Sequence, residues 1–104
     1  LVVSVNEERL DAAIAIRFKE RMREVTSQPG ARVVLDMSQV EFLDSSGLGA
    51  VVAVMKSLVP ERRLELAGLT ANVERVFRLT RMDSVFVMHE NVEAALRAGL
   101  RHVG

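Results

Sequence analysis

The residues of this chain that could do chemistry gather in one short segment, Asp44-Ser45-Ser46-Gly47-Leu48-Gly49. It directly precedes an apolar stretch that is predicted to be a helix. Asp and Ser side chains at a helix start accept hydrogen bonds from the unpaired amides of the first turn. A serine hydroxyl at such a start also points outward, where a phosphate would meet free amides and the positive end of the helix dipole. The segment therefore predicts either a structural cap or a phosphorylation site.

Phosphorylation of such a serine would act on binding more than on folding. A phosphate adds about −1.5 to −2 charges to a small polar surface, and the start of a helix tolerates that charge. A partner packed tightly on the same surface would have to desolvate or accommodate the dianion, whereas the isolated domain would not. The segment thus has the properties of a switch that controls a protein–protein contact.

The elements that must position this segment alternate between strands and helices along the chain. Strands are predicted over 1–5, 32–37, 63–67 and 85–88, and helices over about 12–26, 46–58, 71–80 and 92–100. Asp11 is the expected cap of the first helix, the turn at 28–30 its end, and Pro60 the end of the second. This alternation predicts an α/β domain with about four helices on a sheet of four to five strands, mostly parallel or mixed.

The apolar residues also predict what each element buries. The strand over 32–37 is expected to be central, with both faces covered, and the helix over 46–58 to be largely buried because it is apolar nearly all round. The last helix is expected to pack across an edge of the sheet. The residues expected to point inward are Ala13, Ile16, Met22 and Val25 of the first helix and Val40, Phe42 and Leu43 of the loop over 38–46.

Length and composition limit the classes of function. The 104 residues suit one domain, 1–104, and fourteen acidic residues balance fourteen basic ones, which disfavours binding to nucleic acid or to anionic membranes. Cysteine is absent, so disulfides and thiolate chemistry are excluded. The apolar run over 47–55 is too short to cross a bilayer, and no signal peptide is recognisable. A cytoplasmic protein without direct membrane insertion is expected.

Other chemistry finds little support in the residues. A serine hydrolase needs a base, and His89 and His102 lie near the C-terminus without an orienting motif. The last glycine of a dinucleotide-binding loop would fall at Val52. Asp36 and Asp44 are explained by solvation at a strand end and by helix capping. No catalytic residue, no cofactor and no metal site is therefore predicted.

The run over 33–49, which contains the Asp-Ser-Ser-Gly motif, resembles the hallmark segment of STAS-domain anti-sigma-factor antagonists. Further matches are the residues 9–13 with Phe18, the strand over 64–69, and the helix over 73–77 with Leu79 and Thr80. The resemblance covers nearly the whole chain. It implies the STAS fold and phosphorylation of the second serine of the motif, Ser46, with Ser45 as the alternative.

The resemblance also implies the partners. The unphosphorylated domain would bind an anti-sigma factor that is also a serine kinase and so release a sigma factor, and a PP2C-type phosphatase would reset the phosphorylated form. The residues expected to contact the partner are Asp11, Asp44, Ser45, Ser46, Gly47, Leu48 and Gly49. Phosphoryl transfer would belong to the kinase. The sequence leaves open which kinase and sigma factor are involved and whether the domain forms homo-oligomers.

Two other functions remain as alternatives. One is a STAS scaffold subunit of a stressosome or of a lipid-transport complex, which would co-purify with large assemblies or membrane ATPases. The other is a small serine hydrolase acting through Ser46, which a serine-reactive probe would label covalently.

Overall fold

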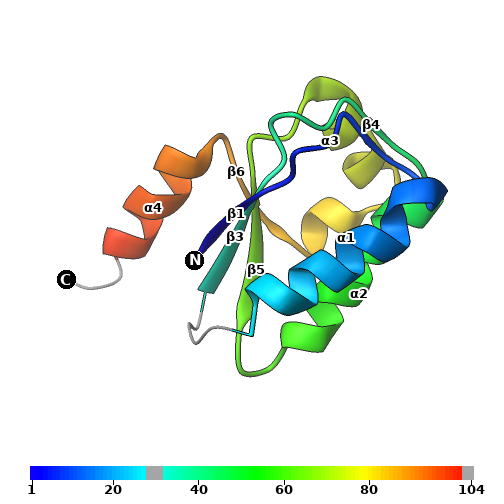
Figure 1. Ribbon diagram of the computed structural model, residues 1–104. Coiled ribbons are helices and arrows are strands. Elements are labelled where there is room, and N and C mark those ends of the chain that lie inside the picture. The colour runs from blue at the N-terminus through cyan, green and yellow to red at the C-terminus, as the bar shows by residue number, and fades with distance from the viewer. Residues whose placement is uncertain (28–31, 102–104) are drawn as a thin grey trace.

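Helices and strands alternate along the chain in the computed structural model, which describes residues 1–27 and 32–101 (Figure 1). The predicted turn at 28–30 and His102 lie outside the described residues. The strands are β1 (Val2–Ser4), β2 (Arg9–Leu10), β3 (Arg32–Asp36), β4 (Phe42–Leu43), β5 (Arg63–Ala67) and β6 (Val87–His89). The helices are α1 (Ala12–Val25), α2 (Ser45–Leu58), α3 (Ala71–Leu79), the 3-10 turn η1 (Met82–Ser84) and α4 (Val92–Arg101). Among the described helices none is long and apolar enough to span a bilayer.

Four strands form one sheet in the order β1-β3-β5-β6, with every neighbouring pair parallel. Parallel neighbours need a crossover, which α1, α2 and α3 supply in turn. Val33, Val34 and Leu35 of β3 are all buried, which confirms the prediction of a central strand. The predicted α/β class, with four helices and a mostly parallel sheet, is likewise confirmed.

The helices cover both faces of the sheet. Figure 1 shows α1 and α2 side by side on one face and α4 alone on the other. The main core lies under α1 and α2, whereas α4 covers a small separate cluster of Val34, Ala67, Ala95 and Val92. The prediction that the last helix packs across an edge was therefore wrong: Ala95 is fully buried against the face of the central strands.

The inward face of α1 also differs from the prediction. Ala15, Phe18 and Met22 are its buried residues, whereas Ala13 is exposed and Ile16 is 66% exposed. The buried three follow one another at intervals of three and four, which is the spacing of one narrow helical stripe. The predicted inward face is rotated about the helix axis from the observed one. The prediction omitted Phe18, the largest apolar residue of the helix.

One side of α2 stays open although nearly all of its residues are apolar. Ala50, Val51 and Val54 are buried in the core, but Gly49 and Ala53 are exposed. The prediction of a largely buried helix thus holds only for the side that faces the sheet and α1, because no described element covers the outer side.

A second sheet of two short parallel strands, β2 and β4, was not predicted. Leu10 of β2 is paired with Leu43 of β4, and both side chains are buried. Val40 is buried as expected, but Phe42 is 41% exposed. The prediction that Phe42 points inward was wrong. Neighbouring residues of a strand point to opposite sides, so Leu43 faces inward and Phe42 outward.

The last strand begins later than predicted. Residues 82–84 form η1, and the ladder starts at Val87. Phe86 is buried outside the ladder, where its ring packs edge-to-face on Phe77 with 5.7 Å between centroids. This aromatic contact fixes the chain before β6 and explains the shift.

Candidate functional site

The Asp-Ser-Ser-Gly segment lies where α1 and α2 begin side by side. Pairing of β2 with β4 aligns the two chains, so Asp11 and Asp44 each follow a paired leucine and cap a helix. The Asp11 carboxylate accepts a hydrogen bond from the Ala13 amide at 3.1 Å, and that of Asp44 accepts from the Gly47 amide at 2.9 Å. The predicted cap at Asp11 is confirmed. At the second helix the cap is Asp44, which makes the two serines the first residues of α2.

Gly47 has a structural reason to be glycine. Its backbone is buried against Leu10, and a Cβ placed on it would overlap the Leu10 carbonyl oxygen and come within 2.8 Å of the carbonyl carbon. Only a residue without a side chain permits this approach of α2 to β2. Gly47 therefore lies under the surface of the site, and Leu48 beside it is half-buried.

Ser45, Ser46 and Gly49 form the exposed part of the segment. Within the described residues neither serine hydroxyl has a hydrogen-bond partner, so nothing in the fold engages the Ser46 oxygen. A Cβ on Gly49 would meet nothing within 4 Å. The structure thus brings together all seven residues predicted for the site, with Asp11, Asp44 and Gly47 holding the frame and Ser45, Ser46 and Gly49 facing outward.

The exposed Ser46 hydroxyl can accept a phosphoryl group without disturbing the core. The first turn of a helix carries amides without intrahelical partners and a positive partial charge. Two carboxylates, those of Asp11 and Asp44, already occupy the two neighbouring helix starts. A phosphate would make this end strongly anionic.

His89 is engaged elsewhere and is not a base for Ser46. It lies at the end of β6 on the α4 side of the sheet, where Nε2 is 2.6 Å from Oε1 of Glu65. The α2 helix, which carries Ser46, covers the opposite face (Figure 1). Over residues 1–27 and 32–101 no three His, Cys, Asp or Glu side chains are grouped as a metal site would require.

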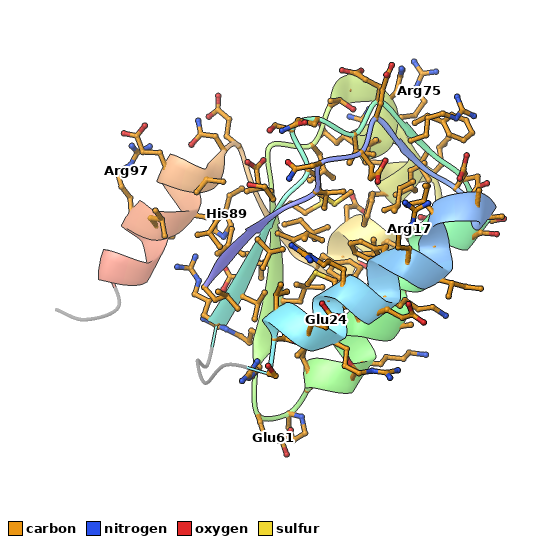
Figure 2. All side chains as sticks on the ribbon, in the orientation of Figure 1. Arg17, Glu24, Glu61, Arg75, His89 and Arg97 are labelled. Carbon is orange, nitrogen blue, oxygen red and sulfur yellow. The ribbon has the colours of Figure 1, made fainter. Side chains whose placement is uncertain are left out.

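Glu65 is the centre of a buried ion network that the sequence did not indicate. It lies in β5 with 3% exposure, and both oxygens bind the Arg32 guanidinium, at 2.7 Å from Nε and 2.7 Å from Nη2. Arg32 Nη2 also donates to the carbonyl oxygen of Ala95 in α4. Figure 2 shows His89 beneath α4. The network joins three strands to the helix that covers them.

The pKa of Glu65 reflects these partners. Hydrogen bonds from Arg32 lower it from 4.5 to about 2, the bond from His89 adds to this effect, and burial opposes it. The ionised carboxylate only accepts hydrogen bonds, so His89 Nε2 must carry the proton that it donates to Oε1. The same contacts raise the pKa of Arg32 above its usual value.

We expect this network to make the fold sensitive to acid. A carboxyl group whose pKa is lower in the folded state stabilises the fold fully above the unfolded pKa, near 4.5, and loses that contribution as pH falls toward 2. A shift of this size corresponds to about 3 kcal/mol. Urea unfolding monitored between these pH values should show a steep loss of stability, and a Glu65→Gln variant a shallower one. If the unfolding free energy of the wild type and that of Glu65→Gln fell equally steeply with pH, this role of Glu65 would be contradicted.

Comparison with known proteins places the chain in a family. The STAS domain model matches residues 1–95. An anti-sigma-B factor antagonist of Listeria monocytogenes is 31% identical over 88 residues, which are 84% of this chain and 76% of that protein.

Solved structures agree with this match. The crystal structure of an anti-sigma factor antagonist from Mycobacterium paratuberculosis has a TM-score of 0.83 and 29% identity over 93% of this chain and 82% of its own. A sulfate transporter family protein from Wolinella succinogenes has a TM-score of 0.78 at 14% identity, over 98% of this chain and 85% of its own, and shares the fold alone. With its parallel sheet and its Asp-Ser-Ser-Gly segment at the start of α2, the chain belongs to the STAS domain family.

Proposed function

We propose that this STAS domain is an anti-sigma factor antagonist that binds an anti-sigma serine kinase when unphosphorylated and is released when Ser46 is phosphorylated. The observation that carries the proposal is the exposed Ser46 side chain in the first turn of α2, whose hydroxyl no described residue engages. The Listeria anti-sigma-B factor antagonist and the Mycobacterium anti-sigma factor antagonist, to which this chain is similar, support an anti-sigma factor as the partner. Binding of the kinase would free a sigma factor, and a PP2C-type phosphatase would reverse the modification.

The position of Ser46 in the fold supports an effect of the phosphate on the complex rather than on folding. Ser46 lies outside the core, and the frame under it is held by the Asp44 cap and by the contact of Gly47 with Leu10. A partner packed over Ser46 would have to bury the dianion next to the carboxylates of Asp11 and Asp44. A loss of about 3 kcal/mol would weaken the complex more than a hundredfold.

Gly49 supports a protein contact at this place. A glycine inside a helix lowers helix stability by about 1 kcal/mol relative to alanine, and the open space around Gly49 gives no internal reason for it. One turn before it lies Ser46, and one turn after it the exposed Ala53. A partner's backbone could approach α2 closely along this side.

The test is mass spectrometry after incubation with ATP and candidate anti-sigma kinases from the same genome. A single phosphate is expected on Ser46, absent from Ser46→Ala and retained in Ser45→Ala, which serves as the matched control. Calorimetry should show that the unphosphorylated domain binds the same kinase. The affinity of Ser46→Asp and of the phosphorylated form should be lower by about a hundredfold or more.

Other results would contradict the proposal in distinct ways. If a kinase bound the domain tightly but did not phosphorylate it, the docking role would stand and the proposed phosphorylation switch would be wrong. If no kinase bound or modified the domain, a scaffold in a larger assembly would become the better function. Covalent labelling of Ser46 by a serine-reactive probe would instead favour a hydrolase.

A further inference from the structure

A strip of exposed side chains lies at the starts of β2 and β4. It consists of two dipeptides, Glu8-Arg9 and Glu41-Phe42, whose four side chains are all exposed. The Glu8 carbonyl oxygen accepts hydrogen bonds from the amides of Glu41 at 2.8 Å and Phe42 at 3.2 Å, and Arg9 is paired with Phe42 in the ladder. Two residues further along each chain come the caps Asp11 and Asp44. The strip is thus continuous with the surface around Ser46.

Phe42 differs from the other phenylalanines of the chain. Its side chain is 41% exposed, whereas each of the others, Phe18, Phe77 and Phe86, is at most 7% exposed. The Arg9 guanidinium carbon lies 4.2 Å from the ring centroid, and Arg9 Nε is 3.4 Å from Oδ2 of Asp11. The stacked cation and its carboxylate hold the ring in one orientation. Immobilising such a ring costs little further entropy, which suits an aromatic anchor of an interface.

The charges around Phe42 indicate what kind of surface would cover it. Glu8 and Glu41 have no ion-pair partner among the described residues, and Asp44 is used as a helix cap. The charge of Arg9 is offset by Asp11. The five charged side chains of the strip and its two caps sum to −3 in a chain whose total is zero. The neighbouring helix α3, which packs on β4, adds Glu74, Arg75 and Arg78, so the local sum stays negative. A complementary partner surface is basic.

We propose that this strip docks a basic face of the kinase: an apolar side chain of the kinase covers the open side of Phe42, and lysine or arginine side chains face Glu8 and Glu41. The inference rests on the proposed function, since the occupant is the kinase that modifies Ser46. It extends the interface beyond the Asp-Ser-Ser-Gly segment to an anchor that phosphorylation does not alter.

The test compares binding of the kinase to variants matched in exposure and charge. Phe42→Ala should weaken binding about tenfold or more, whereas Val59→Ala, whose side chain is 46% exposed at the far end of α2, should bind like the wild type. The double variant Glu8→Lys/Glu41→Lys should weaken binding and flatten its dependence on salt. Its control, Glu24→Lys/Glu61→Lys, makes the same change in net charge at the end of the molecule opposite β2 and β4 (Figure 2).

Each outcome decides the question. The charge-reversed variants leave every buried side chain in place, so they remain informative if Phe42→Ala lowers the melting temperature. If the two double variants bind equally well and Phe42→Ala matches Val59→Ala, the strip is not part of the interface. Should Ser46→Asp weaken binding in that same case, the proposed function stands and only this inference fails. If no kinase binds the wild-type domain, both are wrong.

Discussion

Replacing Glu65 with glutamine is expected to lower the free energy of unfolding by about 3 kcal/mol. The substitution leaves the Arg32 guanidinium, whose side chain is 22% exposed, without a counter-charge on the face covered by α4. It also places an amide group where His89 Nε2 and the Nε and Nη2 atoms of Arg32 donate to the carboxylate. Removing one member of a buried ion pair is costly because the remaining charge stays desolvated. For a domain of this size the melting temperature should fall by about 15 °C.

The matched control is Glu93→Gln on α4. Glu93 pairs with Arg97 at 2.9 Å, but both side chains are more than half exposed. Such a surface pair contributes about 0.5 kcal/mol or less. Urea unfolding of the three proteins at neutral pH measures the difference. If Glu65→Gln were no less stable than Glu93→Gln, the network would not hold the sheet and α4 together.

Gly47→Ala is the second substitution with a large expected effect, a loss of about 3 kcal/mol in unfolding free energy. The added methyl group would meet the Leu10 carbonyl, which is backbone and cannot rotate away. Either α2 or β2 must move, and the alignment of Asp11 with Asp44 would move with it. Kinase binding should therefore weaken as well, even though Gly47 itself is buried.

Gly49→Ala is the natural comparison, because it adds the same methyl group two residues later. Space around Gly49 is open, so alanine should raise stability by about 1 kcal/mol through its better helix propensity. Thermal unfolding of both variants should therefore give shifts of opposite sign. Loss of stability in both would mean that α2 tolerates no side chain at either position.

The sequence was sufficient to predict the main elements because their signals are local. The alternation over 63–67, the apolar run over 32–37 and the caps before the first two helices each specify a short segment without reference to its neighbours. The Asp-Ser-Ser-Gly segment was found for the same reason, since a motif and a helix start are read from adjacent residues. Ser46 stands in the first turn of α2, where the motif predicted it.

The features that could not be predicted all depend on which segments meet in space. Two-residue strands such as β2 and β4 have no periodic signal, and their pairing joins residues 33 positions apart. The role of Glu65 required knowing that α4 covers that face, because an acidic residue in an alternating strand otherwise indicates solvent. The inward side of α1 was misjudged at Ile16, which faces away from the sheet although it is strongly apolar.

The order of the main sheet, β1-β3-β5-β6, follows the order of the strands in the chain. During synthesis each new strand leaves the ribosome after the strand beside which it belongs, so no gap in the sheet has to wait for a later segment. The helix α4, which closes the second face with a small cluster of its own, is made after all the strands of that sheet. Until it is in place, Glu65 and Arg32 lie on an open face, and their desolvation is deferred until the sheet beneath them is complete.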